Sequence, residues 1–187
     1  FHLGEHGHWQ KQTLFEPATR VPLIIRAPSV SNLGANTAPV ELVDLYPTVA
    51  DFAGIEVPEY VRGKSLRGLM EQQVDTVRGS ALTVWRKGKS IATGRYRYTE
   101  WGEDGELGQE LYDHHYDSEE LVNLADSAEK VQLKDSLAAV LARRGRGASI
   151  VPEGIGRQVA NRSALPLNGM TSITNKKPNK NSFSDAF

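Results

Sequence analysis

The stretch ALTVWRKGKSIATGRYRYTEW, residues 81–101, constrains the fold more than any other part of the chain. It is rich in β-branched and aromatic residues, and two glycines interrupt it. This pattern predicts two or three antiparallel strands joined by tight turns. Because side chains alternate across a strand, Tyr96 and Tyr98 are expected on one face of the sheet. Arg95 and Arg97 are then expected on the opposite face.

A helix is expected after these strands. In SAEKVQLKDSLAAVLARR, residues 127–144, apolar residues recur at helical spacing, namely Leu133, Leu137, Val140 and Leu141. Gly145 is expected to end this helix. Upstream of it, Leu111–Tyr112 predicts one more short strand. The spacing of Asp117 and Glu120 then predicts a capping box at the start of a helical turn.

The first half of the chain predicts a different local structure. VPLIIRAP, residues 21–28, is a short apolar run bounded by prolines, which predicts a buried strand. In VELVDLYPTVADFAG, residues 40–54, Pro47 would break a helix that spanned the whole stretch. If Asp44 caps the helix, this proline falls in the first turn, where its missing N–H is no loss. A short extended segment followed by a helix at 45–53 is therefore favoured.

Composition weakens several classes of function. At 187 residues the chain has room for one domain, or one small domain and part of another. Its formal net charge of -1 gives no reason to expect binding to nucleic acid or to an anionic membrane. No apolar run approaches the roughly 20 residues that a membrane-spanning helix needs. The absence of cysteine excludes disulfides, thiolate metal ligands and a cysteine nucleophile within this chain.

The opening stretch FHLGEHGHWQK, residues 1–11, concentrates three histidines, a glutamate and a lysine. Its spacing differs from the HExxH pattern of zinc proteases. Its two glycines also disfavour a helix, since each costs about 1 kcal/mol relative to alanine. A glycine-interrupted loop with imidazoles, a carboxylate and an ammonium suits an active site that handles anions. Composition alone is equally compatible with a solvated loop.

Three other motifs are better explained as structure than as sites. Gly63-Lys64-Ser65 and Gly88-Lys89-Ser90 resemble the end of a phosphate-binding loop, but both lack the required glycine five positions earlier. His114 and His115 lie beside acidic residues, yet adjacent side chains rarely converge on one ion, so a polar turn is favoured. Asn161-Arg162-Ser163 matches a glycosylation acceptor, a tripeptide that is common by chance.

The order and spacing of several blocks add a resemblance to these patterns. The blocks are HLGEHGHWQK, FEPATRVPLIIRAP, VELVDLYPTVADFAGI, RGKSL, RYRYTEW and ELYDHHYDSEELVNLA. Together they resemble the C-terminal part of formylglycine-dependent (type I) sulfatases, over about residues 1–142. Within that family, RYRYTEW and YDHHYD are most similar to the iduronate-2-sulfatase group.

The resemblance implies an α/β fold, namely the C-terminal part of an alkaline-phosphatase-like (sulfatase) fold. Residues 1–80 would form an incomplete C-terminal part of the large α/β domain. Residues 81–148 would form a small C-terminal subdomain of antiparallel sheet plus helix, and residues 149–187 an irregular, mobile tail. The isolated chain is expected to be poorly stable, because a strand at 21–28 would lack neighbours and expose a sheet edge.

The resemblance also implies where the cofactors belong. In the family, an Asp-His-Gly or Asp-Asn-Gly directly precedes the first block, and its first two residues ligate calcium. The calcium ligands of the intact enzyme would thus lie upstream of Phe1, and no metal ligand is assigned within this chain. The Cys/Ser-x-Pro-x-Arg signature, whose first residue becomes formylglycine, would also lie upstream. The missing N-terminal part of the same polypeptide is therefore an implied partner, and this chain alone is expected to be inactive.

Lys11 falls on the lysine that contacts the sulfate in this family and stabilises charge on the leaving oxygen. The underlying chemistry is general, because an ammonium positioned in a dry pocket stabilises a departing anionic oxygen. His2 and His8 are expected to line the same pocket and contact substrate. Glu5 and His6 are expected to brace the loop through hydrogen bonds.

The implied function of the intact protein is hydrolysis of sulfate esters on sugars or glycosaminoglycan-like polysaccharides, in the periplasm or outside the cell. Arg20 and Arg95 could meet a sugar carboxylate, but structural or solvated ion pairs are favoured for both. Three alternatives stay open. The intact protein could be a phosphomonoester or phosphonate hydrolase of the same superfamily, or a non-catalytic module that retains the fold. The chain could also be a separately expressed C-terminal segment that is inert alone.

Overall fold

The computed structural model describes residues 1–27, 30–31 and 34–149. Of the tail predicted at 149–187, residues 150–187 lie outside the described part, as does the tripeptide Asn161-Arg162-Ser163. Within the described residues, no helix combines the length and the apolar character required to cross a bilayer.

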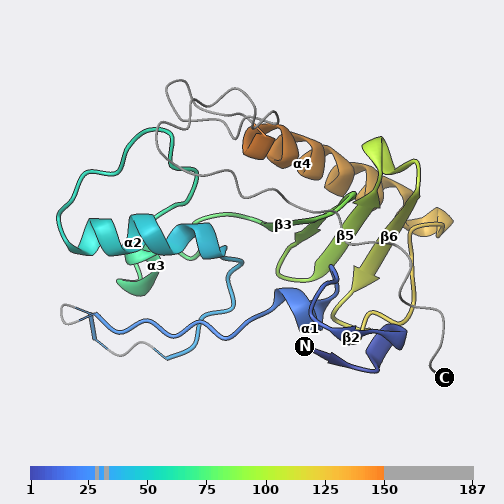
Figure 1. Cartoon of the computed structure of the whole chain (residues 1–187), viewed down its shortest axis with the longest axis horizontal. Coiled ribbons are helices and arrows are strands. Elements are labelled where there is room, and N and C mark those ends of the chain that lie inside the picture. Colours follow the sequence, from blue (N-terminus) through green and yellow to red (C-terminus); the bar gives the residue numbers. More distant parts are fainter. Residues whose placement is uncertain (28–29, 32–33, 150–187) are drawn as a thin grey trace, which may run out of the picture. The chain divides into compact units, whose positions relative to one another are not determined.

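A four-stranded antiparallel sheet forms the second half of the described chain (Figure 1). Its strands lie in chain order: β3 (Ala81–Trp85), β4 (Gly88–Ala92), β5 (Tyr96–Trp101) and β6 (Gly108–Asp113). The strands predicted at 81–101 and at Leu111–Tyr112 are confirmed. Alternation along β5 is confirmed as well, because Tyr98 joins the core on one face while Arg97 is buried in a polar cluster on the other.

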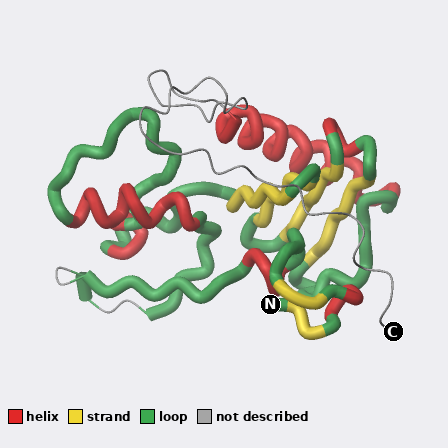
Figure 2. The backbone as a smooth tube through the Cα atoms, viewed as in Figure 1, coloured by secondary structure: helices red, strands yellow, loops and turns green. Residues whose placement is uncertain are grey.

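Helix α4 (Val131–Ser149) packs against the tyrosine-bearing face of this sheet (Figure 2). The buried core between them consists of Ile91, Tyr98, Leu111, Ala125, Leu137 and Leu141. The helix is preceded by a 3-10 turn, η4 (Ala128–Lys130), and it continues past Gly145, so the predicted end of the helix is wrong. Near this point Arg144 donates to the Ser80 carbonyl at 2.8 Å and pairs with Glu41, which holds this part of the helix to the preceding segments.

The helix predicted at 45–53 is confirmed as α2 (Leu45–Phe52) with Ala53 as its C-cap. Of the short extended segment predicted before it, Glu41 has an extended backbone, whereas the residues that follow form a 3-10 turn, η2 (Leu42–Asp44). Asp44 occupies the N-cap position of α2, as predicted, but its side chain makes no capping hydrogen bond to the helix. Its carboxylate instead accepts the backbone N–H groups of Glu41 and Lys64, each at 2.8 Å, and pairs with Arg78.

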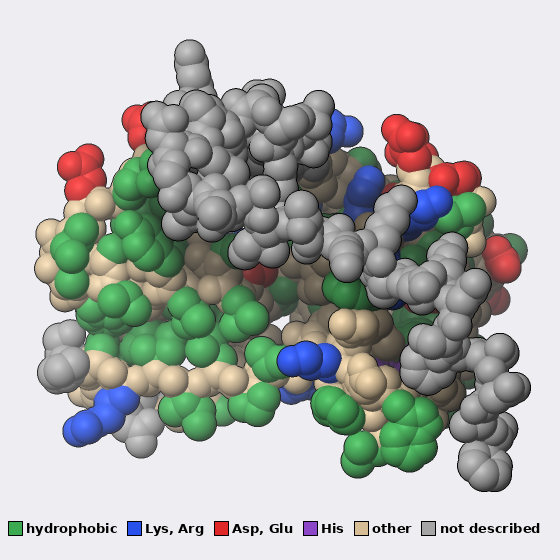
Figure 3. Space-filling model, viewed as in Figure 1, with side chains coloured by type: hydrophobic (Ala, Val, Ile, Leu, Met, Phe, Trp, Pro, Cys, Tyr) green, Lys and Arg blue, Asp and Glu red, His purple; other side chains and the backbone are tan. Residues whose placement is uncertain are grey.

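The strand predicted at 21–28 is wrong in this structure, since residues 21–27 contain no strand and residue 28 is not described. Ile24 is 93% exposed, and the neighbouring Val21 and Leu23 are also exposed. A strand needs a hydrogen-bonding neighbour, and the described residues place none beside this segment. Figure 3 shows hydrophobic side chains at the surface in this part of the chain.

Short elements complete the described part. They are β1 (His2–Leu3), η1 (Glu5–Gly7), β2 (Trp9–Gln10), α1 (Glu16–Thr19), α3 (Arg67–Met70) and η3 (Glu103–Gly105).

Replacing Gly63 by alanine is expected to destabilise the fold, because a Cβ at this position would lie 1.9 Å from the Val43 carbonyl oxygen. Overpacking of this kind costs about 1–3 kcal/mol. Urea unfolding of the full-length protein measures the loss. Gly79→Ala is the matched control, since no heavy atom lies within 4 Å of a Cβ built there. Equal stability of the two variants would contradict the close packing of Gly63.

Candidate functional site

Residues 1–11 fold into a small hairpin, which we call the site hairpin. Strand β1 pairs antiparallel with β2, with His2 opposite Gln10 and Leu3 opposite Trp9. The turn η1 connects the two strands. Lys11 directly follows β2, and its side chain is exposed with no ion pair or hydrogen bond to residues 1–27, 30–31 or 34–149. The ammonium group is therefore available at the end of a formed hairpin.

The backbone of the site hairpin is held in an unusual conformation at two residues other than glycine. His6 has a φ of 53° and Gln10 a φ of 79°. Side chains disfavour this left-handed region, and such strain persists where surrounding contacts enforce it, commonly at functional sites. Gln10 lies directly before Lys11, so its left-handed backbone helps to set the direction of the chain at the lysine.

His2 holds the chain on both sides of Lys11. It is fully buried, and its Nε2 lies 2.7 Å from the Thr13 hydroxyl, while its backbone pairs with Gln10. Its Nδ1 is buried without a hydrogen-bond partner among the described atoms. These contacts favour bracing of the hairpin over direct contact with substrate, and the substrate contact predicted for His2 stays a prediction.

The remaining polar residues of the hairpin contact one another and the following segment. The ring of His6 stacks on Phe15 at 3.9 Å between ring centres, with 1° between the ring planes. The Glu5 carboxylate accepts the Leu3 N–H at 2.6 Å, and this bond lowers the pKa of Glu5. His8 is exposed, and its ring centre lies 5.9 Å from that of His2. The roles of these groups toward a substrate stay predictions.

The site hairpin is expected to loosen at acidic pH because of His2. Burial lowers the pKa of His2 below 6.5, and charges on His6 and His8 lower it further. The unfolded chain therefore binds a proton more readily, so the stability that neutral His2 contributes is complete above about pH 6.5 and is lost as the pH falls. Thermal unfolding between about pH 7 and pH 5 tests this, with His2→Gln expected to flatten the dependence. His115→Gln, at an exposed position, serves as the control; identical pH profiles for all three proteins would contradict the assignment.

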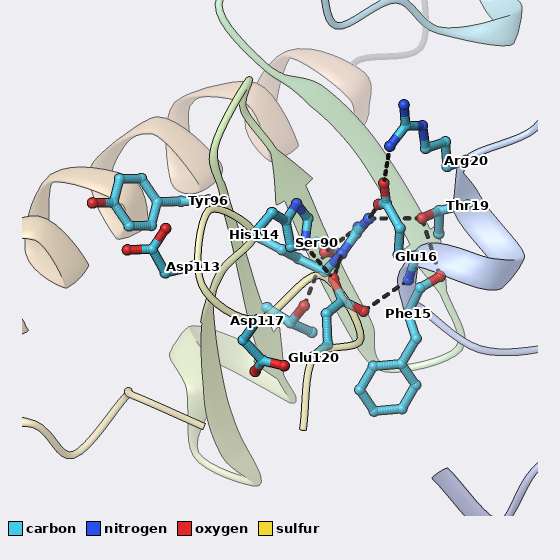
Figure 4. Close-up of polar contacts among 12 residues, drawn as sticks. Phe15, Glu16, Thr19, Arg20, Ser90, Tyr96, Asp113, His114, Asp117 and Glu120 are labelled. Atoms are coloured by element: carbon cyan, nitrogen blue, oxygen red, sulfur yellow. Dashed lines mark hydrogen bonds and ion pairs between the residues drawn. The ribbon is translucent and has the colours of Figure 1, made fainter. Parts of the chain in front are cut away.

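A buried cluster of charges lies on the face of the sheet opposite α4 (Figure 4). We call it the Arg97 cluster; it consists of Glu16, Arg97, His114 and Glu120. Arg97 is 1% exposed, pairs with both carboxylates, and donates to the Thr19 hydroxyl at 2.8 Å. The cluster therefore joins α1, β5 and the loop that follows β6.

Glu120 is the most constrained member of the Arg97 cluster. Its carboxylate pairs with Arg97, accepts the backbone N–H of Glu16 at 2.8 Å and lies 2.7 Å from His114 Nε2. Burial raises the pKa of Glu120, but the bond to His114, the charge of Arg97 and the Glu16 N–H outweigh it, so the pKa lies below its usual value. The residue is thus an anion, fixed by partners from three segments.

The capping box predicted at Asp117 and Glu120 is wrong. Residues 114–119 form turns, and the Asp117 carboxylate accepts the N–H groups of Leu121 and Val122 at 3.0 and 2.8 Å. Glu120 turns inward to the Arg97 cluster, where the ion pair outweighs a local cap. The polar turn favoured for His114 is confirmed.

The Arg97 cluster does not fit a metal site. Glu16, His114 and Glu120 offer ligand atoms within 4.8 Å of one another, which would suit a cation by distance alone. However, the Arg97 guanidinium already pairs with both carboxylates. A divalent ion would have to displace a buried cation that makes several hydrogen bonds, so this group does not fit a calcium site.

Arg20 and Arg95 make the structural ion pairs that the sequence favours. Arg95 binds Asp113 through two bonds of 2.7 and 2.6 Å, and this pairing lowers the pKa of Asp113. Arg20 lies 3.4 Å from Glu16, one helical turn away, with a largely exposed side chain. Neither arginine has to be explained by a substrate.

The sequence profile of the family described as "N-sulphoglucosamine sulphohydrolase, C-terminal" matches residues 4–146, a range that contains Lys11 and the Arg97 cluster. The chain belongs to this family. Among curated relatives, it is 40% identical over 88 residues to an N-acetylglucosamine-6-O-sulfatase of Bacteroides thetaiotaomicron, covering 46% of this chain and 15% of that protein.

Two solved structures show the fold of this family member. One is BT4656 in complex with its substrate D-glucosamine-2-N,6-O-disulfate, with a TM-score of 0.67 and 28% identity over 79% of this chain and 32% of that one. The other is a phosphonate monoester hydrolase from Silicibacter pomeroyi, with a TM-score of 0.64 and 27% identity over 76% of this chain and 32% of that one. The chain therefore has the C-terminal part of the alkaline-phosphatase-like fold, and its sheet plus helix is consistent with the C-terminal subdomain. The domain boundary at residue 80 stays a prediction.

The chain spans between 15% and 31% of the length of curated relatives that it matches.

Proposed function

We propose that the protein to which this chain belongs hydrolyses sulfate esters of sugars, and that this chain supplies Lys11 to the active site. The observation that carries the proposal is an exposed lysine at the end of a braced hairpin, in a member of a sulphohydrolase family. A sulfated sugar is the substrate class favoured by the relatives. A periplasmic or secreted location and the iduronate-2-sulfatase subgroup belong to the same proposal.

The reaction explains why the lysine has to be held in place. Water and a sulfate monoester give an alcohol, sulfate and a proton: overall, a bond from the water oxygen to sulfur forms, and the bond between sulfur and the ester oxygen breaks. The departing oxygen keeps the electron pair of that bond and becomes negative as the transition state forms. The Lys11 ammonium stabilises this charge by a hydrogen bond and gives the oxygen a proton. His2 contributes indirectly, by holding the chain on both sides of Lys11.

Calcium and formylglycine are part of this proposal. The calcium ligands and the residue that becomes formylglycine would belong to polypeptide outside this chain. When bound, calcium would hold the sulfate oxygens, and formylglycine would provide the nucleophile. Calcium suits the task because it is a hard cation that accepts many oxygen ligands. In the described residues, both carboxylates of the group within ligand distance already pair with Arg97, which is consistent with ligands from elsewhere.

A second candidate is a phosphonate or phosphomonoester hydrolase, because a phosphonate monoester hydrolase shares the fold with a TM-score of 0.64. A lysine at this position would stabilise a departing oxygen in either reaction. A non-catalytic module is the third candidate.

Assays of the full-length protein separate these candidates. We expect hydrolysis of 4-nitrophenyl sulfate, loss of activity after calcium chelation and recovery on adding calcium. Preferential hydrolysis of an aryl phosphonate monoester would favour the second candidate. Turnover of neither ester, nor of sulfated glucosamine, would overturn the enzymatic proposal.

A further inference from the structure

We propose that Glu120 is a positioning residue for Lys11, acting on the site hairpin through Glu16 and Phe15. This inference rests on the proposed function for its catalytic consequence. Its structural part stands on contacts within the described chain. The two residues at the ends of this path, Glu120 and Lys11, are separated by more than half of the sequence.

The first step runs from Glu120 to the start of α1. The Glu120 carboxylate is fully buried and accepts the Glu16 N–H at 2.8 Å. This N–H belongs to the first turn of a short helix, where backbone donors lack partners within the helix. The same helix is held from its side chains, since Arg97 binds both Glu16 and Thr19. Glu120 and Arg97 thus fix the position of α1 from the sheet.

The second step runs from α1 to the site hairpin. Phe15 precedes the Glu16 N–H, so fixing that N–H also fixes the base of the Phe15 side chain. Its ring stacks on His6 and also lies 6.1 Å from the Tyr112 ring on β6. A nearly parallel stack at 3.9 Å places one ring directly over the other, which determines where the hairpin turn sits.

The third step runs along the hairpin to Lys11. His6 and His2 lie edge to face at 6.1 Å, and Phe15 lies 6.2 Å from His2. His2 pairs with Gln10 and bonds Thr13, the residues on either side of the lysine segment. A displacement of the Phe15 ring therefore reaches the two points that hold Lys11.

The backbone at Glu120 supports a role beyond simple charge pairing. Its φ is +58°, in the left-handed region that side chains disfavour at a cost of about 1–3 kcal/mol. Four contacts enforce this conformation, from Arg97, His114, the Glu16 N–H and the backbone bond to the Asp117 carbonyl.

Glu120→Gln in the full-length protein tests the inference, with Glu119→Gln as the matched control at the exposed neighbouring position. We expect kcat for an aryl sulfate to fall roughly tenfold or more with KM within about twofold, because misplacing a catalytic group weakens the transition state more than the bound substrate. The control should keep wild-type kcat.

A spectroscopic measurement follows the hairpin without using activity. In protein labelled with ¹³C-histidine, the His6 ring protons, assigned with His6→Gln, are expected at shifted positions because of the stacked Phe15 ring. Glu120→Gln should move them toward unstacked values, and Glu119→Gln should not. Wild-type His6 signals or wild-type kcat in Glu120→Gln would each overturn the inference.

Phe15→Leu provides a second variant that leaves the Arg97 cluster intact, in case Glu120→Gln does not fold. It should produce the same selective loss of kcat, and a wild-type kcat would overturn the inference. Should the wild-type protein hydrolyse no sulfate ester, the proposed function fails, while the His6 signals still decide whether Glu120 positions the hairpin.

Discussion

Lys11→Ala in the full-length protein is expected to lower kcat for an aryl sulfate by at least roughly a hundredfold, the scale seen when one transition-state donor is deleted. The lysine is expected to act on charge that develops on the departing oxygen. The size of the defect should therefore depend on the leaving group. We expect a larger defect with alkyl or sugar sulfates, whose oxygens leave with more unstabilised charge, than with 4-nitrophenyl sulfate.

Steady-state kinetics across a series of leaving groups provides the measurement. Lys87→Ala removes an exposed lysine in the turn between β3 and β4 and serves as the matched control. Lys11→Arg keeps the charge but changes its geometry, so partial activity is expected. A defect of the same size for every leaving group would assign Lys11 to sulfate binding instead. A kcat within about threefold of wild type would remove Lys11 from the chemistry altogether.

The sequence predicts the sheet and its helix well because their signals are local. Alternation in RYRYTEW assigns Tyr98 and Arg97 to opposite faces, and the leucine spacing after residue 130 marks the helix that covers the tyrosine face. These patterns depend on neighbours along the chain. Pro47 likewise limits where α2 can begin through its own geometry.

The Arg97 cluster could not be predicted in the same way, because its members are distant in sequence. Arg97 and Glu16 are 81 positions apart, and Glu120 and Glu16 are 104 positions apart. Nothing local distinguishes the buried Arg97 from the partly exposed Arg95 two residues earlier. The alternation of side chains along β5 could have indicated the cluster, because it places Arg97 on the face opposite the core. An arginine on that face is buried only if another segment covers it. Helix α1 and the loop that carries Glu120 provide that cover.

The strand predicted at 21–28 failed for the complementary reason. Its apolar, β-branched composition fits a strand, but a strand is defined by its partner. In the described residues the segment has no partner, and Ile24 is almost fully exposed. The composition of the segment favours a strand, but local sequence does not specify the neighbouring strand to which it would hydrogen-bond.

Arg97→Met is expected to cost about 3–5 kcal/mol of stability, because removing one partner of a buried ion pair leaves an unpaired buried charge. Glu16 and Glu120 would both lose their guanidinium partner, and Glu120 is fully buried. Chemical denaturation of the full-length protein at neutral pH measures the loss. Arg20→Met is the matched control, since it removes an exposed arginine from the same Glu16. An exposed pair of this kind contributes about 0–1 kcal/mol.

The pH dependence of the Arg97→Met defect identifies its cause. In the wild type, the pKa of Glu120 is lowered, so its stabilising charge is present above about pH 4.5 and is lost as the pH falls. In the variant, the carboxylates lose the cation that favours their charged form, and burial favours protonation. The difference in stability between the two proteins should therefore be largest near neutral pH and narrow toward acidic pH. A loss of stability that stays constant with pH would be due to packing around the Arg97 side chain. A loss no larger than that of Arg20→Met would show that the buried cluster does not hold the hairpin segment to the sheet.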